Sequence, residues 1–90
     1  MQVVITLRGD VVPQLLGEEP AGPDAGVVAD AIAERGVEMS PMHPQEPDLT
    51  LRRYFVVNVD GYNRAEEVIN RLMACPAVEG AYPKPVDEPA

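Results

Sequence analysis

The most chemically versatile side chains of this sequence are two thioethers, one imidazole and one thiol, which belong to Met39, Met42, His43 and Cys75. Thioethers and imidazole are suitable ligands for Cu(I), and a thiol paired with an imidazole can act as a nucleophile. However, the chain has a single cysteine, and no third residue is evident that would orient His43. We therefore expect the methionines to fill gaps in a core and Cys75 to be a buried apolar residue, with no metal ion and no cofactor.

Paired carboxylates are the next pattern that could indicate catalysis. Glu18 is adjacent to Glu19, and Glu66 is adjacent to Glu67. Neighbours in the sequence do not converge on one substrate, so neither pair resembles a general acid and base. The segment RGDVVPQ supplies Arg8 but no cradle of backbone donors for an anion, and no glycine-rich phosphate-binding motif is present. The sequence therefore predicts a protein that is not an enzyme.

The overall charge narrows the choice of partners. The 90 residues carry a formal net charge of -8. Such a chain repels phosphate groups, which argues against nucleic acid and anionic membranes and favours a basic partner, a cation or simple solubility. It contains no apolar run of about 18 residues that could span a bilayer. Met1 leads directly into a strand pattern without a secretory signal, so we expect a cytoplasmic chain as given, or a piece of a longer chain.

Segments with strand-like alternation or a helical apolar stripe follow one another in the order strand, helix, strand, strand, helix, strand. They are expected at Gln2–Arg8, from Val27 to Gly36, at Val37–Met42, at Leu51–Val59, from Asn63 to Pro76 and at Val78–Tyr82. This order predicts an α+β fold of the ferredoxin-like βαββαβ type, with a four-stranded antiparallel sheet and both helices on one face. One domain would cover residues 1–82, and residues 83–90 would form an extended C-terminal tail.

The connections carry their own signals. Gly9–Ala25 is rich in proline and glycine and is expected to be a loop, tacked down by Leu15 and Leu16. Asp24 is expected to cap the first helix. Asn63, with a glutamate three residues later, resembles a capping box at the start of the second helix.

A sheet with both helices on one face leaves its other face uncovered. Alternation along the strands assigns Val4, Tyr54 and Val56 to that open face, and we assign Tyr82 of the last strand to it as well. An apolar patch of this kind typically marks a docking surface. Two alternatives remain: the Gly9–Ala25 loop folds over the face, or two copies of the chain dimerise through it.

The stretch NRAEEVINRLMACPAVEGAYPKP, together with the βαββαβ order, resembles the propeptide-like inhibitors, or prodomains, of subtilisin-class serine proteases. In both, a helix ends at a proline, a small residue and a valine follow, and a last strand leads into an extended tail. The resemblance covers roughly residues 27–90. The long Gly9–Ala25 segment departs from the shorter connection of the family.

This resemblance implies a function and the residues that perform it. The open face, with Val4, Tyr54, Val56 and Tyr82, would pack on a subtilisin-class protease, and the tail would lie in the active-site cleft as an extended strand. The tail residues are Pro85, Val86, Asp87, Glu88, Pro89 and Ala90. Ala90 would precede the cleaved bond, and Asp87 would stand where subtilisin-like enzymes favour an apolar residue.

The family also places acidic side chains at the N-termini of two protease helices, where the helix dipole favours anions. Glu46 and Asp48, in the loop between the two middle strands, are the candidates in this chain; solvated loop carboxylates are the plain alternative. The implied protein inhibits its protease, in cis or in trans, and assists its folding as an intramolecular chaperone. The principal alternative is a small regulatory, ACT-like domain that binds a metabolite or dimerises; a structural adaptor is a third.

Overall fold

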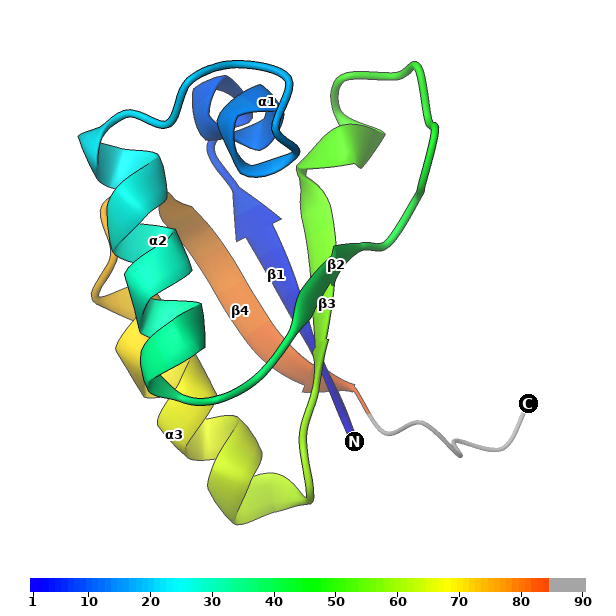
Figure 1. Cartoon of the computed structure of the whole chain (residues 1–90). Helices are drawn as coiled ribbons and strands as arrows, with labels where there is room; N and C mark the ends of the chain where they lie inside the picture. The colour runs from blue at the N-terminus through cyan, green and yellow to red at the C-terminus, as the bar shows by residue number, and fades with distance from the viewer. Residues whose placement is uncertain (85–90) are drawn as a thin grey trace.

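Strand β1 (Gln2–Leu7) lies in the centre of the sheet, as expected for a segment that is apolar on both faces. The computed structural model describes residues 1–84 and contains a four-stranded antiparallel sheet in the order β2-β3-β1-β4. The other strands are β2 (Met39–Pro41), β3 (Tyr54–Asn58) and β4 (Val78–Lys84). The predicted α+β class with a four-stranded antiparallel sheet is therefore confirmed (Figure 1).

The described part of the chain also contains three α-helices and two short 3-10 turns. They are α1 (Val12–Leu15), α2 (Pro23–Glu34), α3 (Tyr62–Met73), η1 (Gly9–Val11) and η2 (Leu51–Arg53). Helix α2 connects β1 to β2 and α3 connects β3 to β4, and Figure 1 shows both on the same side of the sheet. Between residues 1 and 84 we find no helix with the length and apolar character needed to cross a membrane.

The hydrophobic core lies between the sheet and the two long helices. Alternate side chains of the central strands point into it and meet the apolar stripes of α2 and α3. The strands contribute Val3, Ile5, Leu7, Phe55 and Val57, and the helices contribute Ala25, Val28, Ala31, Ala65, Val68 and Leu72. Each fully buried valine, leucine, isoleucine or phenylalanine side chain stabilises the fold by about 1.5–3 kcal/mol, so this cluster holds the sheet and helices together.

The Gly9–Ala25 segment differs from the predicted loop, because most of it is helical and part of it enters the core. It forms η1, α1 and the first turn of α2. Val11 and Val12 are buried in the core cluster and Leu15 is partly buried against it, as predicted, whereas Leu16 is exposed. The two valines and Leu15 therefore anchor the segment. Because these valines pack with the side chains on the helix side of the sheet, the segment does not fold over the opposite face.

Both helix starts also differ from the prediction. Helix α2 begins at Pro23, with Gly22 as the N-cap residue, so Asp24 lies inside the first turn and does not cap the helix. Helix α3 begins at Tyr62 after Gly61, whose φ of 109° is readily adopted only by glycine, and Asn63 makes no capping hydrogen bond. Helix α2 ends at Glu34, and Gly36 follows with a φ of 65°, a conformation that favours glycine after the end of a helix.

The strand boundaries shift for local reasons. Strand β3 is shorter than predicted because residues Leu51–Arg53 form a 3-10 turn before it. Strand β4 is two residues longer than predicted and continues through Pro83 to Lys84, which pairs with Gln2. Proline is tolerated there because β4 is an edge strand whose outer side needs no hydrogen-bond donor.

Candidate protein interface

The sheet face opposite the helices gathers the residues predicted for binding. In the antiparallel register Val4 pairs with Val56 on one side and with Tyr82 on the other, and Thr6 pairs with Tyr54. Paired residues, and residues two apart on a strand, share a face of the sheet. The structure therefore brings Val4, Tyr54, Val56 and Tyr82 together on one face, which we call the open face.

Exposure differs among these residues, and one of them differs from the prediction. Tyr82 keeps 52% of its surface exposed, and Tyr54 and Val56 are half-buried. Val4 is only 1% exposed, although it lies outside the core cluster formed with the helices. Its pairing partners on both neighbouring strands shield it, so Val4 supports the open face from beneath and does not itself present a contact surface.

The open face also carries uncharged polar residues. Alternation along the predicted strands already assigns Thr6 and Asn58 to it, and the register adds Gln2, Ser40, Gly80 and Lys84. No aspartate or glutamate occupies any of the positions that the register assigns to this face, although the chain holds 15 of these residues. The open face is therefore an uncharged area, apart from Lys84 at one end, on a strongly acidic protein. Sequence reasoning did not identify the β4 positions Gly80 and Lys84, because these depend on the register.

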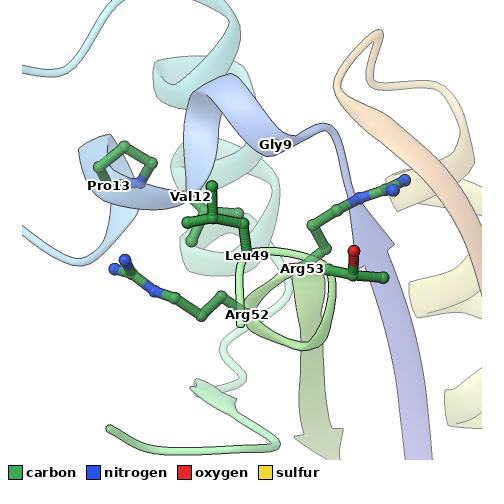
Figure 2. A pocket seen from close by; sticks show the side chains of 7 residues that line it. Gly9, Val12, Pro13, Leu49, Arg52 and Arg53 are labelled. Carbon is green, nitrogen blue, oxygen red and sulfur yellow. The ribbon is translucent and has the colours of Figure 1, made fainter. Parts of the chain in front are cut away.

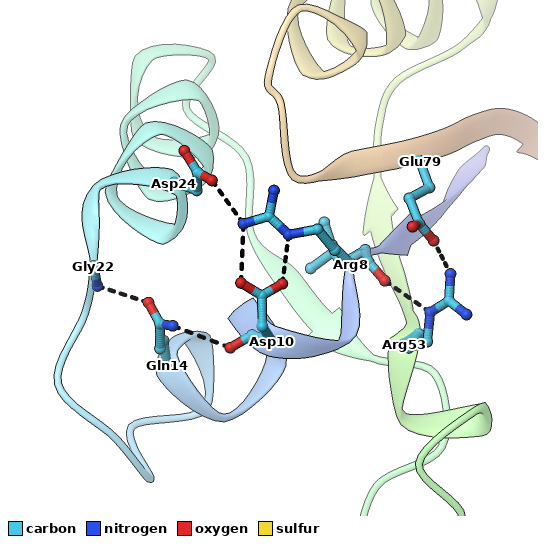
Figure 3. Close-up of polar contacts among 8 residues, drawn as sticks. Arg8, Asp10, Gln14, Gly22, Asp24, Arg53 and Glu79 are labelled. Carbon is cyan, nitrogen blue, oxygen red and sulfur yellow. Dashed lines mark hydrogen bonds and ion pairs between the residues drawn. The ribbon is translucent and has the colours of Figure 1, made fainter.

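The register of β4 is fixed by a bulge and an arginine. The pairing with β1 shifts between Thr6 and Leu7, where Glu79 is the additional residue on β4. Arg53, at the end of η2, donates a hydrogen bond from Nε to the Leu7 carbonyl oxygen at 3.0 Å and forms an ion pair with Glu79 (Figure 3). The arginine thus ties β3, β1 and β4 together across the sheet.

A second polar cluster holds the connection between β1 and α2 (Figure 3). Arg8 donates hydrogen bonds to Asp10, with 2.9 Å between Nη2 and Oδ2, and to Asp24, with 2.6 Å between Nη2 and Oδ2. Gln14 accepts a hydrogen bond from the Gly22 amide at 2.6 Å. The hydrogen bond from Arg8 lowers the pKa of the exposed Asp10 carboxyl. Asp24, predicted to be a cap, instead ties α2 to the end of β1.

The predicted helix-capping acids lie in the loop between β2 and β3. The Asp48 amide donates to Glu46 Oε1 at 3.2 Å, and the Thr50 amide donates to Asp48 Oδ1 at 2.8 Å. The loop leaves the sheet beside Tyr54, whose ring meets that of His43 edge-on at a centroid distance of 6.4 Å. Each carboxylate accepts one of these local bonds and keeps further acceptor positions toward solvent.

The reactive residues are separated from one another. Cys75 is buried, with its Sγ atom 3.9 Å from the Val27 carbonyl oxygen, and burial raises the pKa of its thiol. His43 lies on the loop beside the open face. Among residues 1–84, no three histidine, cysteine or acidic side chains lie close enough together to hold a metal ion.

The predicted tail residues Pro85, Val86, Asp87, Glu88, Pro89 and Ala90 lie outside the described residues. Strand β4 ends immediately before them, at the Gln2 end of the open face. Comparison of the chain with protein-family models, with curated proteins and with solved structures finds no match.

Proposed function

We propose that this chain is a protease-binding module that acts as a propeptide-like inhibitor of a subtilisin-class serine protease. The observation that carries the proposal is the open face, a surface without charge apart from Lys84 on a chain of net charge -8. Tyr82 is exposed on its edge strand β4, which runs from this face toward the C-terminus. Interface centres are depleted in charged residues and enriched in tyrosine, so this face has the composition of a docking surface.

The finer fold assignment belongs to the same proposal. We infer a ferredoxin-like arrangement, which is supported by the strand order β4-β1-β3-β2 when the sheet is read from the β4 edge. It is supported further by α2 joining β1 to β2 and α3 joining β3 to β4. This arrangement gives the module a broad face for the protease and a last strand that ends at its border.

The tail would provide inhibition through backbone pairing. Six residues follow Lys84 and span at most about 20 Å when fully extended, which is enough to occupy several substrate positions of a cleft. An extended peptide that adds to an exposed strand of the protease gains affinity from main-chain hydrogen bonds, and its alternate side chains enter pockets. Prolines at positions 85 and 89 reduce the entropy lost on binding. A module that binds only the native protease also stabilises it, which would assist its folding.

Glu46 and Asp48 would act at the opposite end of the open face. Tyr54 pairs with Thr6, whereas Lys84 pairs with Gln2, so the loop and the tail flank the face from two ends that lie about 13 Å apart along β1. Carboxylates there could meet the N-termini of partner helices, where the helix dipole favours negative charge. The partner would therefore be held at both ends of the sheet.

Residual peptidase activity of a subtilisin-class protease tests the proposal. We expect the full chain to inhibit, and a chain that ends at Lys84 to inhibit far more weakly, because β4 is retained and the tail is removed. The second candidate, a regulatory domain that dimerises through the open face, is supported by the lack of acidic residues at the positions that the register of residues 1–84 assigns to that face. It predicts no inhibition by either chain, and a dimer in sedimentation experiments that dissociates in a Tyr82→Arg variant.

A further inference from the structure

A hollow at the end of the sheet lies outside the open face and takes no part in the proposed protease contact. It has a volume of about 360 Å³ and lies between the η1–α1 segment and the loop that leads into η2 (Figure 2). Its lining residues are Gly9, Val12, Pro13, Leu49, Thr50, Arg52 and Arg53. Small-molecule sites are typically concave, largely apolar and about 300–1,000 Å³ in volume, so this hollow has the size of a site for a small ligand.

The hollow combines an apolar surface with two cations. Val12, Pro13 and Leu49 form its apolar part, and Leu49 is 74% exposed in the free chain. Figure 2 shows the side chains of Arg52 and Arg53 extending to opposite sides of Leu49. A chain with 7 lysines and arginines against 15 acidic residues thus places two arginines beside one hollow.

Of the two arginines, Arg52 has more donors to offer. Arg53 already contacts the Leu7 carbonyl oxygen and Glu79. In the described residues Arg52 contacts one acid, Glu18, with 2.8 Å between Nη2 and Oε1. A guanidinium group carries five N–H donors in a planar fork that matches a carboxylate. Arg52 can therefore donate hydrogen bonds to a second carboxylate.

The charges around Arg52 decide from which side an anion would approach. A neighbouring hollow of about 420 Å³ also includes Arg52, but its lining contains Glu18 and Glu46. Among residues 1–84, no acidic residue lines the hollow formed by Val12, Pro13 and Leu49. An anion is repelled on the first side, whereas on the second it meets apolar groups, the neutral Thr50 and two arginines.

We propose that this hollow binds a small organic acid, whose apolar body packs against Val12, Pro13 and Leu49 and whose carboxylate pairs with Arg52. The inference goes beyond the proposed inhibitor function and does not depend on it. Glu18 holds the guanidinium in place in the free protein and competes with the ligand for it.

The test is a titration of the full chain with phenylacetate, followed by the amide chemical shifts in two-dimensional proton–nitrogen NMR. The neutral phenylacetamide serves as the matched control for the carboxylate. Salt at about 0.1 M limits the repulsion by the acidic chain, since the Debye length is then about 10 Å. We expect saturable shifts confined to the residues that line the hollow, with a dissociation constant on the order of 1–10 mM for so small a ligand. Phenylacetamide should bind more weakly by roughly tenfold, because it lacks the charge-assisted bond.

Two variants separate recognition by Arg52 from general effects. Arg52→Gln should weaken phenylacetate binding by roughly tenfold. Arg71→Gln should leave it unchanged; Arg71 is the matched control because its side chain is 26% exposed against 23% for Arg52, and each pairs with a glutamate that is 54% exposed. Glu18→Gln should strengthen binding, because it removes the competing carboxylate, and a gain cannot arise from misfolding.

Any of three results would overturn the proposal: no saturable shifts at concentrations tenfold above the expected range, equal binding of phenylacetate and phenylacetamide, or equal affinity of the wild type and the Glu18→Gln variant. The titration contains no protease. Its outcome is therefore independent of the inhibition experiment, and each proposal can fail without the other.

Discussion

Tyr82 offers the sharpest test of the open face as a docking surface. A tyrosine side chain can bury 150–250 Å² at an interface, and Tyr82 is 52% exposed in the free chain. About 100 Å² of its surface would therefore be buried on binding, which at about 25 cal/mol per Å² contributes about 2.5 kcal/mol. Replacement by alanine should weaken inhibition of a subtilisin-class protease by roughly sixtyfold. The assay is the inhibition constant from residual peptidase activity.

Tyr82→Ala also uncovers Val4, so the stability of the variant must be measured beside its inhibition. Tyr82→Phe keeps the ring and should inhibit nearly as well as the wild type. Tyr62→Ala is the matched control, because Tyr62 is 64% exposed but belongs to α3, which packs on the other side of the sheet. If folded Tyr82→Ala and Tyr62→Ala both inhibit within twofold of the wild type, the open face is not the binding surface.

Three further predictions concern the fold. Gly26→Ala should raise the free energy of unfolding by about 0.5–1 kcal/mol, because Gly26 lies inside α2 with no atom within 4 Å of an added Cβ. Gly61→Ala should lower the free energy of unfolding by about 1–3 kcal/mol, because Gly61 has a φ of 109°. Urea unfolding measures both changes, and changes of the same sign would contradict the prediction. The pKa of Asp10 is lowered by Arg8 in the folded state, so this carboxylate stabilises the fold above its ordinary pKa of 3.8, and the contribution is lost as the pH falls toward the lower folded value. The melting temperature of Asp10→Asn should therefore differ from that of the wild type at neutral pH, and the two should converge in acid. A difference in melting temperature that does not change with pH would refute the assignment. Cys75 should react slowly with iodoacetamide in the native chain and rapidly in urea, because burial both shields its thiol and raises its pKa; equal rates would show that the site opens readily.

The sequence predicted best those elements that depend on local apolar periodicity. The central strand, the core-facing residues Ile5 and Phe55, and the stripe with Val68 and Leu72 lie as alternation and helical spacing predict. The pairing of Val4 with Val56 and Tyr82 also agrees with the open face that alternation suggested.

The errors arose where tertiary contacts override local propensity. Asp24 has the side chain of a good N-cap residue, but it lies in the first turn of α2, where its carboxylate pairs with Arg8. The proline-rich segment after β1 is helical because this conformation packs the side chains of Val11 and Val12 into the core. For the candidate site, the bulge at Glu79 sets the register of β4, and a bulge has no reliable signal in a single sequence.

The two edges of the sheet are unequal in what they offer another strand. Strand β2 presents three residues, one of which, Pro41, has no amide hydrogen, whereas β4 presents seven, of which one, Pro83, has none. In the described residues, each chain therefore offers one long strand edge, that of β4, to which a strand of another chain can add. A particle with a single such edge can close into a symmetric pair, but it cannot grow into a filament, because growth requires two complementary edges on every subunit. Because β2 is so short, edge-to-edge strand pairing between chains stops at the pair and does not extend into a polymer, even at high protein concentration.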